Sequence, residues 1–221
     1  MIALVYMDSF WLNHLQHHHA RYDEQGYLFF TEPQEEIRRA ANTEVLALLQ
    51  GHGVIRASGV DAEAFLQGQF SNDVTALTMN QAQLTAWCSP KGRVLALMLL
   101  LRDESGYNLL IPRALIPATL KRMRMFVLRS KVVLEDFSDQ CVYLGCAGTG
   151  IEQHLQRQFG SVPDVAYAVQ HHAGLQLTRL PGPRPRFLIG GTPSAVMTNW
   201  PLLSASLTLV GDAAWQWLDI E

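Results

Sequence analysis

Two tryptophans and two carboxylates lie close together near the end of this 221-residue chain. Trp215 and Trp217 offer flat aromatic surfaces, and Asp219 and Glu221 offer hydrogen-bond acceptors beside them. A heteroaromatic ligand with an amino-pyrimidine edge suits this pattern, because its rings can stack on an indole while a carboxylate accepts from its N–H groups. Tryptophan packs in protein cores more often than it holds a ligand, so chemistry alone favours a core role and leaves the binding role open.

A basic cluster lies at residues 121–131, around the end of a helix predicted over residues 113–127. Its members are Lys121, Arg122, Arg124, Arg129 and Lys131. Positive charge near a helix C-terminus is favourable by itself, which makes a solvated face the preferred interpretation. The alternative is an anion site for a phosphate or for a carboxylate tail.

A glycine-rich turn, GxxGxG at residues 145–150, lies between a predicted strand and a predicted helix. Backbone N–H groups in such a turn can bind a phosphate. The order differs from the GxGxxG of dinucleotide-binding folds, and its counterpart in the first half, residues 57–61, does not suit a dinucleotide. A tight strand-to-helix turn is therefore the preferred interpretation.

Histidines and cysteines offer two further kinds of chemistry. The histidines with helical spacing are His14, His17, His18 and His19. Because no carboxylate or cysteine accompanies them at a specific spacing, they favour an exposed polar face over a metal site. The cysteines are Cys88, Cys141 and Cys146. Their odd number and their places in predicted strands favour buried, reduced side chains.

The composition indicates a globular protein without a secretion signal. The chain is 48% hydrophobic and 17% charged, with a net charge of −3 and a pI near 6.2. Its longest apolar runs, residues 1–7 and 94–101, are too short for a membrane helix. A reducing cytoplasm is the simplest compartment, membrane association is not expected, and the acidic balance argues against direct nucleic-acid binding.

The elements that must position these residues form two similar halves. We predict an N-terminal arm over residues 1–43, a first half over 44–138 and a second half over 139–221. Residues 57–70 match residues 146–159 at a shift of 89, and each half is predicted as β-α-β-β-β-α. This order favours an α+β fold with antiparallel sheets. The last predicted helix runs to the final residue without a cap, from which we expect further sequence beyond it.

Four ordered motifs resemble the YgfZ-type folate-binding, tRNA-modifying proteins, which are relatives of the glycine cleavage T-protein. They are GVDAEAFLQGQ (59–69), NDV (72–74), CSPKGR (88–93) and FVLRSKV (126–132), with a weaker match in AWQWLDIE (214–221). The resemblance implies a duplicated folate-binding module, with the family's C-terminal β-barrel and its Lys-Gly-Cys signature outside these 221 residues. It also implies a tetrahydrofolate or one-carbon derivative as cofactor, and iron–sulfur enzymes such as those that thiolate tRNA as partners.

The resemblance also assigns roles to particular residues. Trp215 matches a folate-contacting tryptophan, Glu221 matches a glutamate that binds the pterin edge, and a second tryptophan of the family falls on His52. We expect these residues and Asp73 to face a pocket between the halves. The aspartate used for aminomethyl transfer falls near Ala96, which counts against the alternative of a folate-dependent aminomethyltransferase or demethylase. A third alternative is an interaction module with a vestigial pocket.

Overall fold

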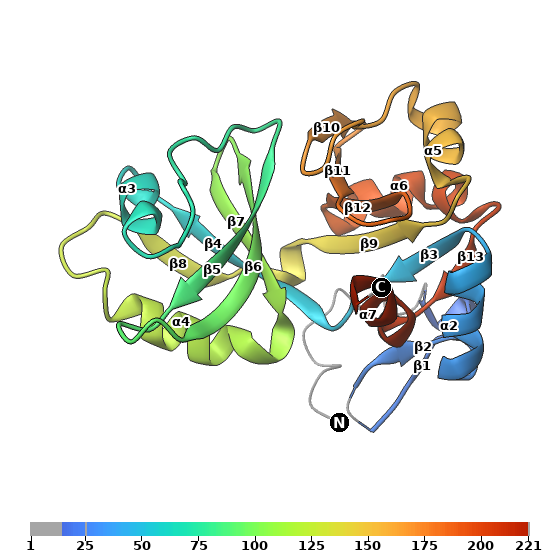
Figure 1. Ribbon diagram of the computed structural model, residues 1–221, viewed down its shortest axis with the longest axis horizontal. Coiled ribbons are helices and arrows are strands. Elements are labelled where there is room, and N and C mark those ends of the chain that lie inside the picture. The colour runs from blue at the N-terminus through green and yellow to red at the C-terminus, as the bar shows by residue number, and fades with distance from the viewer. Residues whose placement is uncertain (1–14, 25, 221) are drawn as a thin grey trace. The chain divides into compact units, whose positions relative to one another are not determined.

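The computed structural model describes residues 15–24 and 26–220, and its contacts divide the chain into two compact units (Figure 1). Unit 1 comprises Met1–Gly51 with Asp139–Glu221, and unit 2 comprises His52–Ser138. Almost all strand pairs are antiparallel, and helices follow the strands in both units. The predicted α+β class with antiparallel sheets is therefore confirmed.

Unit 2 is a five-stranded sheet with two α-helices. Its elements are β4 (His52–Ser58), α3 (Ala62–Gln67), β5 (Ala82–Cys88), β6 (Val94–Asp103), β7 (Gly106–Pro112), α4 (Ile116–Arg124) and β8 (Val133–Asp136). The strands lie in the order β5-β6-β7-β4-β8. Alternate residues of β4, β6 and β7, such as Ile55, Leu100 and Leu109, point into a core closed by Leu66 of α3 and Met123 of α4.

Unit 1 contains a six-stranded sheet and a small two-stranded one. The N-terminal elements are β1 (Arg21–Tyr22), β2 (Leu28–Phe29), α2 (Pro33–Asn42) and β3 (Val45–Leu48). The later ones are β9 (Val142–Ala147), α5 (Ile151–Phe159), β10 (Val169–His172), β11 (Leu175–Leu180), β12 (Arg186–Gly191), α6 (Pro193–Ser204), β13 (Thr208–Val210) and α7 (Asp212–Ile220). The large sheet has the order β10-β11-β12-β9-β3-β13.

The two repeats exchange their leading strands. β3 precedes β4 in the chain but pairs with β9, while β8 precedes β9 but pairs with β4. The registers correspond, because Val45 faces Ala147 and Val133 faces Ser58, and Ser58 and Ala147 are equivalent at the shift of 89. This reciprocal pairing supports a duplicated sequence. It also places β3 in the sheet of unit 1, although sequence analysis grouped residues 44–51 with the first half.

One predicted strand is displaced in the structure. The apolar run of residues 165–169 favours a strand, but only its last residue, Val169, belongs to one, and β10 runs from there to His172. Val165 is exposed, and Tyr167 has a φ of 65°, a left-handed conformation that interrupts an extended chain. The short strand β13 was not predicted, because three residues carry almost no periodic signal.

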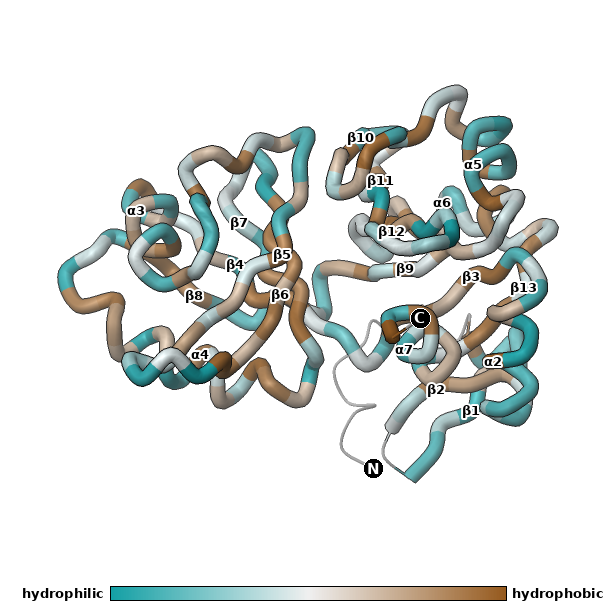
Figure 2. The backbone as a smooth tube through the Cα atoms, in the orientation of Figure 1, coloured by the Kyte–Doolittle hydropathy of each residue, from teal (hydrophilic) through white to brown (hydrophobic). Residues whose placement is uncertain are grey.

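Both faces of the unit 1 sheet are covered by helices, and α7 packs on one of these faces. Leu46, Leu144 and Phe187 point into a core with residues of α5 and α6. The alternate residues, Val45 and Gly145 among them, are also buried, and on their side of the sheet α7 packs beside α2 (Figure 1). In Figure 2, α2 and α5 are mostly hydrophilic while β3 is hydrophobic, as a strand buried on both faces requires.

Candidate functional site

Trp215, the tryptophan singled out in the sequence, packs directly on the unit 1 sheet. Its side chain is 3% exposed. A Cβ at Gly145 of β9 would lie 2.3 Å from Cζ3 of the indole, so only glycine leaves room for the ring. Gly145 pairs with Ala47 of β3 on one side and Leu188 of β12 on the other. The floor beneath the indole is therefore made of three neighbouring strands.

Arg186, at the start of β12, packs on the same indole. Its guanidinium carbon lies 5.5 Å from the centroid of the Trp215 ring. Nη1 donates to the Leu218 carbonyl at 2.7 Å and to Oδ1 of Asp219 at 2.8 Å, and Nη2 donates to the Pro181 carbonyl at 3.0 Å. These hydrogen bonds hold the guanidinium at the C-terminal end of α7 and against Trp215.

Sequence reasoning missed Arg186 because it was one residue of an ordinary predicted strand. Arg186 lies near α7 because β12 pairs with β9. In this pairing Arg186 is opposite Ala147, so its side chain is on the same face of the sheet as Gly145. A local pattern contains no such information. Trp215 and Asp219, which sequence analysis considered together, both contact Arg186.

The start of α7 is held by the buried carboxylate of Asp212. Its Oδ1 accepts from the backbone N–H of Gly51 at 2.7 Å, and its Oδ2 accepts from that of Leu28 at 3.1 Å. The side chain is 1% exposed. Burial raises the pKa of Asp212 to about 6, although the two N–H donors oppose the shift.

A second buried carboxylate, Glu36 of α2, holds the residue before Asp212. Its Oε2 accepts from the Gly211 N–H at 2.8 Å, and its Oε1 accepts from Phe30 and Thr31 at 2.6 and 2.9 Å. Glu36 also contributes to the raised pKa of Asp212. Burial, followed by the charge of Asp212, raises the pKa of Tyr22. Two acidic side chains therefore join the N-terminal elements to α7.

The other predicted site residues belong to unit 2 or lie outside the described residues. His52 and Asp73 belong to unit 2, where His52 begins β4 and is half-buried. Asp73 is exposed and accepts from the N–H and the hydroxyl of Thr75, and the hydroxyl hydrogen bond chiefly lowers its pKa. Glu221 lies outside the described residues. Whether these residues meet a common ligand stays a prediction.

Ala96 lies in the hydrophobic core of unit 2. It is 3% exposed and pairs with Trp87 across β5 and β6. No carboxylate is present at this position to assist an aminomethyl transfer.

The glycine-rich turn already holds an anion from the chain itself. Oε1 of Glu44 accepts from the N–H of Gly150, the residue that caps α5, at 2.9 Å. A Cβ at Gly148 would lie 2.8 Å from the Cα of Glu44. The turn therefore serves packing between β9, α5 and the residue before β3, in line with the preferred interpretation.

The histidine and cysteine patterns give no metal site in the described part of the chain. His14 lies outside that part, and His18 accepts at Nε2 from the indole N–H of Trp200 at 3.3 Å. Across residues 15–24 and 26–220, no group of three or more His, Cys, Asp or Glu side chains is arranged to hold a metal ion. The expectation that all three cysteines are buried is wrong for Cys88, which is exposed beside a β-bulge, and Cys141 is half-buried.

Within the same residues, every helix is too short or too polar to span a bilayer.

Comparison with solved structures defines the fold class. The glycine cleavage system aminomethyltransferase T from Bartonella henselae matches with a TM-score of 0.74 at 14% identity, covering 91% of this chain and 58% of that one. A heterotetrameric sarcosine oxidase from Corynebacterium sp. U-96 matches with a TM-score of 0.50 at 13% identity, covering 80% and 84%. The chain therefore has the fold of the glycine cleavage T-protein.

Sequence comparison is more specific. The tRNA-modifying protein YgfZ of Pectobacterium carotovorum subsp. carotovorum (strain PC1) is 31% identical over 163 residues, 74% of this chain and 49% of the relative. The protein of the same name from Hamiltonella defensa is 34% identical over 142 residues, 64% and 42%. No family model matches. The resemblance to the YgfZ-type proteins is thus confirmed, and the chain spans about half the length of the curated relatives it matches.

Proposed function

We propose that this protein binds a tetrahydrofolate or a one-carbon derivative and supports iron–sulfur enzymes in tRNA modification in the cytoplasm. The proposal rests on a similarity in sequence and a similarity in fold that point to related functions. The chain is similar in sequence to proteins named for tRNA modification, and its fold is that of an aminomethyltransferase of the glycine cleavage system. Trp215, Glu221, His52 and Asp73 remain the proposed folate contacts.

The groups around α7 have the chemistry that a pterin requires. The indole of Trp215 offers an aromatic face, the guanidinium of Arg186 offers N–H donors, and the carboxylate of Asp219 offers an acceptor. The indole is nevertheless covered, so stacking on it requires the Arg186 side chain to leave. When bound, tetrahydrofolate would supply a carrier for one-carbon groups; the residues named here would bind and orient it.

Titration calorimetry with tetrahydrofolate under reducing, anaerobic conditions tests this proposal. Stacking on an indole is worth about 0.5 to 1.5 kcal/mol and a charge-assisted hydrogen bond about 1.5 to 3 kcal/mol. We therefore expect Trp215→Ala and Glu221→Gln each to weaken binding roughly tenfold. Trp200→Phe provides the control, because Trp200 packs in the opposite core with His18. Unchanged affinity in both site variants would refute the placement of the ligand.

The burial of Trp215 favours a second candidate, an interaction module whose folate pocket is vestigial. A chain of this class would give no heat with folate in any variant, yet would retain its fold. An aminomethyltransferase is the less favoured alternative, since Ala96 offers no carboxylate.

A further inference from the structure

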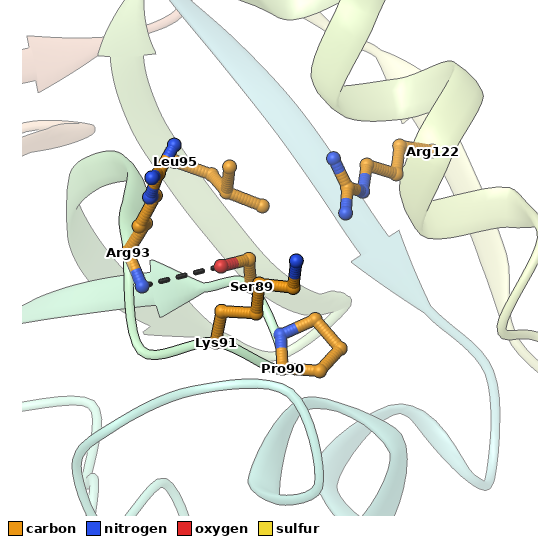
Figure 3. Close-up of a pocket in the computed structure, with 6 residues that line it drawn as sticks. All are labelled: Ser89, Pro90, Lys91, Arg93, Leu95 and Arg122. Atoms are coloured by element: carbon orange, nitrogen blue, oxygen red, sulfur yellow. Dashed lines mark hydrogen bonds between the residues drawn. The ribbon is translucent and has the colours of Figure 1, made fainter.

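A small pocket with basic residues lies in unit 2, between the β5–β6 turn and α4. It is open to solvent, has a volume of about 370 Å³, and is lined by Ser89, Pro90, Lys91, Arg93, Leu95 and Arg122. Figure 3 shows the turn between β5 and β6 on one side and Arg122 of α4 on the other, with the Leu95 side chain pointing into the space between them. Three basic residues therefore surround a pocket whose lining is mostly apolar.

The turn that carries two of these cations has a defined shape. The Ser89 N–H donates to the Arg93 carbonyl at 2.8 Å, and the Arg93 N–H donates to Oγ of Ser89 at 3.2 Å. Gly92 has a φ of +74°, and no atom lies within 4 Å of the position of a Cβ there. Lys91 and Arg93 are exposed on either side of this glycine. The backbone thus presents both side chains without needing a ligand to order it.

Arg122 is held from the opposite wall. Its guanidinium lies 5.8 Å from the ring centroid of Trp87, a tryptophan that is 4% exposed and belongs to the core. A cation placed on a buried ring is restricted in its movement. In the described part of the chain no carboxylate pairs with Lys91, Arg93 or Arg122, so their charge is available to an external anion.

The sequence around the pocket extends this positive field. Between residues 74 and 134 there are nine lysines and arginines but only two acidic residues, Asp103 and Glu104. Asp103 is engaged by Arg56. The net charge of −3 for the whole chain therefore hides a long cationic stretch in unit 2. Unit 2 as a whole has ten lysines and arginines against seven acidic residues, and this positive balance suits a polyanion.

We propose that Lys91, Arg93 and Arg122 form a phosphate-binding pocket that takes the backbone of a polynucleotide, with RNA as the ligand class. Lysine and arginine are the usual partners of backbone phosphates, and such contacts position a polynucleotide without reading its sequence. This inference deepens the proposed role in tRNA modification and rests on it, because it gives the protein its own contact with RNA. It departs from the expectation of no direct nucleic-acid binding, which rested on the acidic balance of the whole chain and left a local basic patch open.

Fluorescence anisotropy with a labelled tRNA transcript, in the absence of folate, tests the pocket. We expect the Lys91→Gln/Arg93→Gln double variant to bind at least about tenfold more weakly at 100 mM salt. The slope of log K against log salt should fall by about 1.4 to 1.8, for two lost phosphate contacts. Adding Arg122→Gln should weaken binding further. Both hairpin side chains are exposed, so the double variant tests the pocket even if the Arg122 variant does not fold.

The control removes the same charge elsewhere in unit 2. Lys121→Gln/Arg129→Gln should change the affinity by less than about threefold, since neither side chain lines the pocket. Equal losses in the two double variants would overturn the pocket, as would the absence of tRNA binding by the wild-type chain at 50 mM salt. Competition by poly-γ-glutamate as strong as that by tRNA would show a carboxylate site instead. Because the assay contains no folate, a negative result leaves the calorimetric test of folate binding unaffected.

Discussion

The indole ring of Trp215 lies directly against the backbone of Gly145. A methyl group at residue 145 would overlap the ring, with its Cβ 2.3 Å from Cζ3. We expect Gly145→Ala to lower the free energy of unfolding by about 1 to 3 kcal/mol, because Trp215 or the strand must shift. Urea denaturation measures the loss. Gly68→Ala is the control, since its Cβ would meet no atom closer than 3.5 Å; an equal loss there would contradict the steric cause.

The buried carboxylate of Asp212 predicts a dependence of stability on pH. Its pKa is raised to about 6 in the folded chain, against about 3.9 in an unfolded one. The folded state therefore binds the proton more tightly, and this group's contribution is present below pH 4 and is lost as the pH rises to about 6. The wild-type chain should gain about 3 kcal/mol relative to Asp212→Asn between pH 7 and pH 4.

Chemical denaturation at several pH values measures this difference. Asp164→Asn provides the control, because Asp164 is exposed. A constant difference between the wild type and Asp212→Asn across the range would show that Asp212 titrates alike in the folded and unfolded states.

The carboxylate of Glu44 predicts a smaller, local effect. It accepts from the N–H of Gly150, at the N-terminus of α5, where a negative charge also interacts favourably with the helix dipole. Glu44→Ala should reduce the free energy of unfolding by about 0.5 to 2 kcal/mol, the usual cost of losing an N-cap acceptor. Thermal denaturation compares it with Glu104→Ala, an exposed residue of unit 2. Equal stability in the two variants would contradict a capping role for Glu44.

Periodicity in the sequence was sufficient to predict most elements of both repeats. The apolar runs of β6 and β7 and the Ser89–Arg93 turn between β5 and β6 are local patterns that the sequence shows directly, and the structure contains them. Sequence periodicity could not predict that β3 and β8 exchange places between the two sheets. A strand of four buried residues such as β3 has the same pattern whichever sheet it joins, so only its pairing with β9 reveals its place.

The same distinction applies to the candidate site. Trp215 was identified from residue type and from the family resemblance, but its cover, Arg186, depends on the pairing of β12 with β9. Asp212 looked like an ordinary first residue of a helix. Its burial follows from contacts with Gly51 and Leu28, which lie more than 160 residues away along the chain.

Removal of the Arg186 side chain should expose Trp215. The guanidinium packs on the indole and is held there by hydrogen bonds to Pro181, Leu218 and Asp219. We expect Arg186→Ala to increase quenching of tryptophan fluorescence by acrylamide, by about the share of one among five tryptophans. Arg157→Ala is the control, because Arg157 donates to Gln153 in its own helix. The increase should disappear when Trp215→Phe is combined with Arg186→Ala. An increase that persists in the double variant would show that another tryptophan is exposed. No increase in Arg186→Ala alone would show that Arg186 does not shield the Trp215 indole.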